Sequence, residues 1–216
     1  MLFNLTLPML ISRIITLLLA FTFHEFAHAA TANALGDPTP KNNGRLTLNP
    51  LAHLDVMGTL TLLVAGFGWA KPVPVNPYAV RRKTSAGMML VSLAGPATNL
   101  LLGVLAAIPL RFDWVRLAPS TNAFLPSWGS FLLEFLTINL ALFLFNLIPL
   151  APLDGEKVMT FFLPEHWTGF FDRIRPYSPL ILLAILFVLP MFGLDLMNII
   201  IRQPLNSLAL FLIGRR

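Results

Sequence analysis

The sequence predicts an all-α integral membrane protein, a polytopic helical bundle of four to six membrane segments with a short β or extended re-entrant region between the first and second full spans. Two observations carry this prediction. Of the 216 residues, 56% are hydrophobic and only 12% are charged, and the mean hydropathy is +0.74. In addition, four stretches of the chain approach or exceed the roughly 20 apolar residues that a membrane-crossing helix needs. We expect one membrane-embedded domain over residues 1–216.

The four expected spans are bounded by charged or helix-breaking residues. The first ends before Gly36-Asp37-Pro38, the second lies between Lys83 and Arg111, and the third carries a single charge, Glu134, near its start. The spans are residues 8–35, 84–110, 130–150 and 176–198. Two further apolar stretches, residues 56–70 and 203–214, are too short to be counted as full spans.

Residues 36–83 are expected to form the strand and re-entrant region. Within them, residues 44–50 alternate polar and apolar side chains and close on Asn-Pro, a pattern typical of a short strand. Prolines at positions 72, 74 and 77 exclude a helix and a central strand, so residues 69–77 are expected to be an extended edge or a polyproline-like run. A surface connector is the simpler alternative for both segments.

The segment His24-Glu25-Phe26-Ala27-His28 lies inside the first apolar span. Ionisable side chains are costly within a membrane and are tolerated where they pair, face a wet cavity or bind something. Residues four apart share one face of a helix, and H-E-x-x-H on a helix is the arrangement of two zinc ligands beside a glutamate that acts as general base. We therefore expect His24 and His28 to bind Zn²⁺ and Glu25 to be the catalytic base.

Asp154 is the expected third ligand. A catalytic zinc takes three protein ligands and keeps one position open, and the chain has no cysteine. Asp154 precedes Gly155 and follows two prolines that break the third span at membrane depth, where irregular backbone is tolerated only inside protein or along a wet cavity. The alternative is an aspartate that caps the next helix. We expect one Zn²⁺ per chain.

These ligands also constrain the topology. His24 and His28 lie in the C-terminal half of the first span and Asp154 lies at the C-terminal end of the third, so both spans must run in the same direction. Residues 84–110 provide the one crossing between them, and residues 56–70 are therefore expected to dip into the membrane without crossing it. Nine Lys and Arg then fall on the metal's face and about four on the other, which makes the metal's face cytoplasmic.

Three blocks of the sequence resemble the hallmark motifs of the site-2 protease family of intramembrane zinc metalloproteases. They are the HExxH segment, Ala94-Gly95-Pro96-Ala97-Thr98-Asn99, and the stretch from Asn146 to Leu153-Asp154-Gly155. The resemblance implies a zinc endopeptidase that hydrolyses peptide bonds within or near transmembrane segments, in a compact form without PDZ or CBS domains. It also implies that Asn99 and Asn146 bind substrate or support the site, although interhelical hydrogen bonding is an equal alternative.

The remaining expectations concern His53, location and partners. His53, close to Asp55, is a candidate for substrate gating, with a satisfied interfacial histidine as the alternative. We expect a multi-pass protein of a prokaryotic plasma membrane that acts on transmembrane protein substrates. The net charge of +5 suits anionic lipid rather than nucleic acid. The oligomeric state is left open.

Two other functions fit parts of the pattern. A transporter of metal ions or protons would use intramembrane His, Glu and Asp as a relay, but it should string them toward both faces, whereas here they cluster at one depth apart from Glu134. A catalytically inactive relative would serve as a membrane-bound binding or scaffold protein. The glutamate of the motif argues against it, since that residue is needed for turnover and not for binding metal.

Overall fold

The computed structural model describes residues 6–55, 57–58, 61, 68–120 and 122–214. Among these residues, four helices are long and apolar enough to cross a membrane. Three of them are α1 (Leu7–Ala34), α5 (Gly87–Arg111) and α6 (Trp128–Asn146), and the fourth runs from Gly169 to Met191. The expected all-α membrane bundle is thus confirmed, and a shorter apolar helix, Asn198–Ile213, follows.

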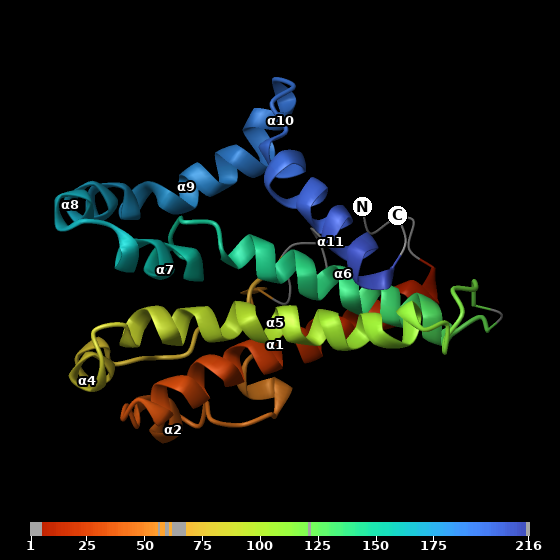
Figure 1. Cartoon of the computed structure of the whole chain (residues 1–216), viewed down its shortest axis with the longest axis horizontal. Helices are drawn as coiled ribbons and strands as arrows, with labels where there is room; N and C mark the ends of the chain where they lie inside the picture. Colours follow the sequence, from red (N-terminus) through yellow and green to blue (C-terminus); the bar gives the residue numbers. More distant parts are fainter. Residues whose placement is uncertain (1–5, 56, 59–60, 62–67, 121, 215–216) are drawn as a thin grey trace.

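The three long helices form the centre of the bundle. α5 packs against both α1 and α6, and α1 and α6 run in the same direction with α5 antiparallel to both (Figure 1). Leu136 and Leu140 of α6 are fully buried against Ala106 and Ala107 of α5, and this core also includes residues of α11 (Gln203–Ile213). The parallel arrangement of α1 and α6 is the one that the ligand set required.

The ends of the long helices follow from local chemistry. α1 ends where Gly36 takes a positive φ of 90°, a conformation that costs glycine little, and the Gly36 amide donates to the carbonyl oxygen of Asn33. The Ser127 side chain accepts a hydrogen bond from the Ser130 amide at the start of α6. α6 ends at Asn146 rather than at the expected residue 150, because the chain turns there into a segment that holds Pro149 and Pro152.

α1 ends and α5 begins at the same end of the bundle, and the segment between them is described only in part (Figure 1). It contains α2 (Thr39–Asn42), the 3₁₀ turn η2 (Pro50–Ala52) and α4 (Pro77–Lys83). Residues 71–76, which precede α4, belong to no helix or strand, as their prolines predict. The expected re-entrant course of 56–70 falls mostly outside the described residues.

The expected strand over residues 44–50 is wrong. The described part of this region contains no strand, and its one β-type pairing is an isolated bridge between Leu54 and Ala70. Side chains satisfy the backbone instead: Thr47 Oγ1 accepts from the Asn49 amide and Asn49 Oδ1 accepts from the Leu51 amide, both at 3.1 Å. Such local bonds compete with a strand ladder, so the short alternation of polar and apolar residues did not indicate a sheet edge.

The C-terminal third bends back over α6. α7 (Asp154–Phe162) and α8 (Glu165–Ile174) are followed by η3 (Arg175–Tyr177), α9 (Ser178–Leu183), the π-helical η4 (Ala184–Val188) and α10 (Leu189–Met191), and after a turn by the π-helical η5 (Asn198–Arg202) and α11. The apolar range Gly169–Met191 within these helices overlaps the expected fourth span, 176–198, from residue 176 to residue 191. A turn at Gly193, whose φ is 78°, separates it from α11.

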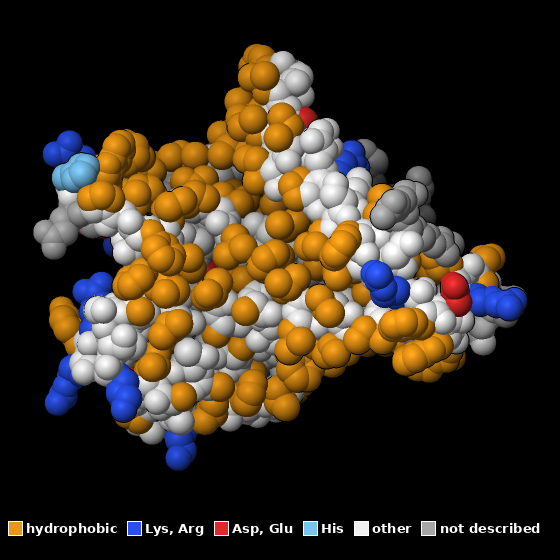
Figure 2. All heavy atoms as spheres, in the orientation of Figure 1, with side chains coloured by type: hydrophobic (Ala, Val, Ile, Leu, Met, Phe, Trp, Pro, Cys, Tyr) orange, Lys and Arg blue, Asp and Glu red, His pale blue; other side chains and the backbone are white. Residues whose placement is uncertain are grey.

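The surface of the bundle suits a bilayer. Hydrophobic side chains cover the middle of the face in view, and most Lys and Arg side chains lie toward its two ends (Figure 2). Exposed leucines such as Leu101 and Leu105 on α5 and Leu180 on α9 belong to this apolar surface. In water such a surface would be unfavourable, whereas lipid tails solvate it.

Candidate metal centre

His24 and His28 occupy the buried stripe of α1. Its buried residues include Ala20, His24, His28 and Ala32, which recur every four positions and therefore share one face of the helix. Both imidazoles are less than a tenth exposed. The packing of α1 against α5 and α6 thus holds two metal-binding side chains inside the bundle, one helical turn apart.

Asp154 reaches the same point from α7, of which it is the first residue. A Cβ on Gly155 would collide with the carbonyl oxygens of Leu147 and Ile148, so the glycine allows α7 to start tightly against the turn that follows α6. The Asp154 carboxylate faces the two imidazoles, with Oδ2 3.2 Å from each Nε2.

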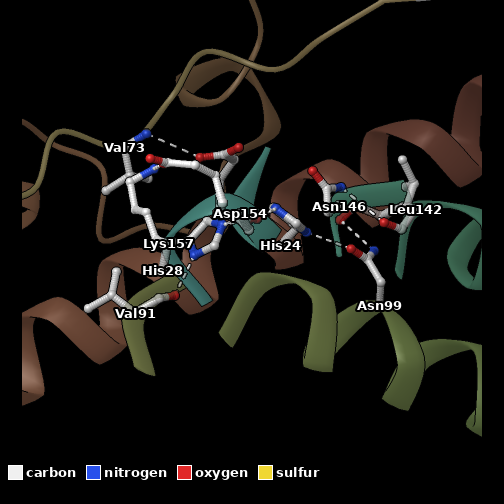
Figure 3. Close-up of polar contacts among 12 residues, drawn as sticks. His24, His28, Val73, Val91, Asn99, Leu142, Asn146, Asp154 and Lys157 are labelled. Carbon is white, nitrogen blue, oxygen red and sulfur yellow. Dashed lines mark hydrogen bonds and ion pairs between the residues drawn. The ribbon is translucent and has the colours of Figure 1, made fainter. Parts of the chain in front are cut away.

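The three ligand atoms form a nearly equilateral triangle. His24 Nε2 and His28 Nε2 are 3.0 Å apart, and each lies 3.2 Å from Asp154 Oδ2. Two ligand atoms bound at about 2.0–2.1 Å to a tetrahedral zinc are about 3.3 Å apart. Figure 3 shows the three side chains pointing toward one another. In the described part of the chain they are the only group of three or more such residues spaced to hold a metal.

Hydrogen bonds at the far side of each ring define the chemistry of this triangle. His28 Nδ1 lies 2.7 Å from the Val91 carbonyl oxygen and His24 Nδ1 lies 2.6 Å from Asn99 Oδ1. Each Nδ1 must donate to its oxygen, so each neutral ring presents a lone pair at Nε2. Two lone pairs and a carboxylate oxygen that face one another at 3.0–3.2 Å repel unless a cation lies between them. The donor set therefore fits Zn²⁺.

Gly95 on α5 leaves the space that the two rings occupy. A Cβ at this position would lie 2.5 Å from His28 Nε2 and 2.6 Å from His24 Nε2, well inside any normal contact. The sequence alone indicates Gly95 only as part of a motif that resembles one of the site-2 protease family. Its steric role is visible only once α5 is placed against α1.

Glu25 lies beside the triangle and is also buried. Its Oε2 accepts a hydrogen bond of 3.2 Å from the Val73 amide, which fixes one carboxylate oxygen. The segment that carries Val73 is held in turn by Arg45, whose guanidinium donates to the carbonyl oxygens of Lys71 and Ala52. The proline-rich run thus packs against Glu25 and fixes the position of its carboxylate.

The other expected site residues separate into two groups. Asn99 lies at the centre, hydrogen-bonded to His24 (Figure 3). Asn146 lies nearby in the same view, but its Nδ2 donates to the Leu142 carbonyl oxygen of its own helix. His53 is fully buried and bonds through Nε2 to the Thr47 carbonyl oxygen, so it stabilises the 45–54 loop and is not part of the metal-binding group.

One residue at the centre was missed by the sequence analysis. Asn139 of α6 is fully buried, and its Oδ1 accepts a hydrogen bond of 2.9 Å from Asn99 Nδ2. It belongs to no recognised motif. The available signal was a second asparagine, seven residues before Asn146, in an otherwise apolar span.

Comparison with known proteins places this centre in a family. The chain is 42% identical over 178 residues to the "Putative zinc metalloprotease YwhC" of Bacillus subtilis, covering 82% of this chain and 80% of that protein. It is 38% identical over 142 residues to the "Putative zinc metalloprotease Rip2" of Mycolicibacterium smegmatis, covering 64% and 52%. For Rip2 of Mycobacterium tuberculosis the identity is 33% over 179 residues, covering 80% and 65%.

No family model matches the chain, and no solved structure matches it. The relation to YwhC nevertheless extends over four-fifths of both proteins, and the chain contains a buried ligand triangle suited to zinc. The protein therefore belongs to the family of zinc metalloproteases that includes YwhC.

Proposed function

We propose that the protein is an intramembrane zinc endopeptidase of the site-2 protease type, which hydrolyses peptide bonds within or near transmembrane segments of other membrane proteins. The observation that carries the proposal is the position of the ligand triangle. His24 and His28 lie inside a helix long and apolar enough to span a membrane, and Asp154 follows another such helix after a short turn. A peptide bond cut at this centre therefore lies at membrane depth.

Each residue of the centre has a distinct role in the proposed reaction. His24, His28 and Asp154 hold the zinc ion, which supplies Lewis-acid activation of water and of the scissile carbonyl when bound. Glu25 accepts the proton of the attacking water and delivers it to the nitrogen of the leaving amine. The Val73 amide, 3.2 Å from Glu25 Oε2, holds this carboxylate in orientation and leaves its other oxygen to face the reacting atoms.

An apolar cavity supports entry of the substrate from the bilayer. It has a volume of about 550 Å³ and lies between α1, α6 and the C-terminal helices, with Leu17, Phe21 and Phe145 among its lining residues. Leu17, Phe21 and Glu25 are four residues apart and thus share one face of α1. A transmembrane segment has its backbone bonded internally, so the substrates should be segments whose helix unwinds easily.

The distribution of charge supports a cytoplasmic position for the metal end of the bundle. Nine cations follow the C-terminal end of α1, precede α5 or follow α6, namely Lys41, Arg45, Lys71, Arg81, Arg82, Lys83, Lys157, Arg173 and Arg175. Arg13, Arg111 and Arg116 belong to the opposite end. Cytoplasmic loops carry the excess of Lys and Arg, which makes the protein a multi-pass protein of a bacterial plasma membrane with its centre toward the cytoplasm.

The decisive experiment separates chemistry from metal binding at Glu25. Glu25→Gln keeps the size of the side chain and removes the base, so cleavage of a model transmembrane substrate in proteoliposomes should fall about 10²-fold or more, while the zinc content should stay near one per chain. Glu134→Gln is the matched control, because Glu134 is also within a span but pairs with Arg13. Near-normal turnover in Glu25→Gln would refute the mechanism. Absence of turnover in the wild-type protein would favour the scaffold alternative.

A further inference from the structure

Two side-chain amides are fully buried in the middle of the bundle. Asn99 of α5 and Asn139 of α6 both have no exposed surface. A polar group in such surroundings is costly unless it is hydrogen-bonded. Both amides are bonded, and together they link α6 through α5 to His24 of α1. The donor and the acceptor of each hydrogen bond in this series can be assigned by starting from Asn139.

The direction is set by a backbone carbonyl. Asn139 Nδ2 donates a hydrogen bond of 2.9 Å to the Phe135 carbonyl oxygen of its own helix, and a carbonyl oxygen can only accept. Asn139 therefore presents its Oδ1, not its amide nitrogen, to α5. That Oδ1 accepts from Asn99 Nδ2 at 2.9 Å, and the same Nδ2 also points to the Ala20 carbonyl oxygen at 3.4 Å.

The consequence reaches His24. The amide nitrogen of Asn99 donates to these two acceptors. Asn99 must therefore present Oδ1 to the His24 imidazole, 2.6 Å from Nδ1. His24 can then bond only with a proton on Nδ1, which leaves the lone pair of Nε2 facing Asp154 and His28. His28 reaches the same state by a shorter route, since its Nδ1 bonds directly to the Val91 carbonyl oxygen.

We propose that Asn139 is a positioning residue for the metal: through Asn99 it fixes the orientation and the tautomer in which His24 binds zinc. This inference rests on the proposed zinc function and extends it to a residue that contacts no metal ligand. Hydrogen-bond partners behind a ligating histidine set its ring orientation, and their loss costs about 10- to 100-fold in metal affinity or activity. The alternative is that Asn139 only joins helices, as asparagine commonly does in membrane bundles.

The positioning role and the purely helix-joining role predict different effects of Asn139→Leu on zinc affinity. If Asn139 positions His24, the variant should bind zinc about 10- to 100-fold more weakly in competition with a chelator. Asn139→Asp should stay within about threefold of the wild type, because a protonated carboxyl group offers the same donor to Phe135 and the same acceptor to Asn99. Thr137→Val is the matched control, since Thr137 bonds to the Leu133 carbonyl oxygen four residues back in the same helix.

Ring ¹⁵N spectra of the zinc-loaded, histidine-labelled protein provide a second measurement. His53→Gln and His166→Gln identify the signals of the other two histidines, which leaves those of His24 and His28. In Asn139→Leu, the His24 Nδ1–H signal should move and exchange faster with water, while that of His28 should stay. A purely structural disturbance would move both signals.

The outcomes separate the possible failures. Unchanged zinc affinity in Asn139→Leu, equal shifts of both ring signals, or an Asn139→Asp protein as impaired as Asn139→Leu would each overturn the positioning role. If Asn139→Leu does not fold, Asn139→Ala takes its place in both measurements. A wild-type protein that binds no zinc would instead refute the proposed function itself.

Discussion

Replacing Gly95 by alanine tests the geometry of the metal centre with a single methyl group. Gly95 is a buried residue of α5, and a Cβ built there lies 2.5 Å from His28 Nε2 and 2.6 Å from His24 Nε2. Ordinary contact begins at about 3.4 Å. The new methyl group would thus lie almost against the two atoms that bind the metal.

The displacement this requires is large compared with the tolerance of the site. To restore ordinary contact, both imidazoles or the α5 backbone must move by about 0.8–0.9 Å, whereas ligand distances in a metal site hold to about ±0.2 Å. Overpacking of this kind costs about 1–3 kcal/mol. If the zinc-bound arrangement bears that strain, zinc affinity falls about 5- to 150-fold, and activity should be lost with it.

Zinc competition with a chelator measures this loss directly, with the thermal stability of each protein as a check on folding. Gly103→Ala is the control on the same helix. Its Cβ would meet Leu140 Cδ2 at 3.2 Å, a flexible side chain that needs to move only a few tenths of an ångström, so zinc affinity should be unchanged. A Gly95→Ala protein that keeps the zinc affinity of the wild type would refute the packing of α5 against the two histidines.

Two further predictions follow from the ligand set and the topology. Asp154→Asn removes the anionic ligand while keeping the size of the side chain, so the zinc content should fall well below one per chain. Asp172→Asn is the control. An undiminished zinc content in Asp154→Asn would show that a different residue is the third ligand. The chain has no cysteine, so Asn43→Cys and Ala123→Cys can be labelled singly. An impermeant thiol reagent outside intact cells should label only position 123, and labelling at 43 would place the metal end outside.

Most of the helical framework could be predicted from the sequence because membrane helices have a strong and simple signal. Long apolar runs located α1 and α5 to within a few residues. The predicted fourth span begins at residue 176 because Arg173 and Arg175 precede it, whereas the helix itself starts earlier, at Glu165. Arg175 pairs with the buried Glu156 of α7, a contact that only the tertiary structure supplies.

The sequence also predicted the metal-binding triangle, since HExxH on a helix defines two ligands and the proline-broken turn indicates the third. The strand over residues 44–50 could not be distinguished from a loop, because alternation over seven residues is weak evidence when Thr and Asn can bond to the backbone. Asn139 was missed for a different reason. An asparagine in an apolar span looks the same whether it joins helices or orients a ligand, and the distinction depends on which of its two polar atoms faces which helix.

α5 acts as the template for the centre. Val91, Gly95 and Asn99 are spaced by four residues and therefore share one face of that helix. Because α5 runs antiparallel to α1, Val91 meets His28 and Asn99 meets His24, while Gly95 lies between the two rings. One stripe thus supplies both acceptors and the space between them. A shift of α5 by one turn, about 5.4 Å, would remove all three at once, so the spacing from Gly95 to Asn99 sets the helix register that zinc binding requires.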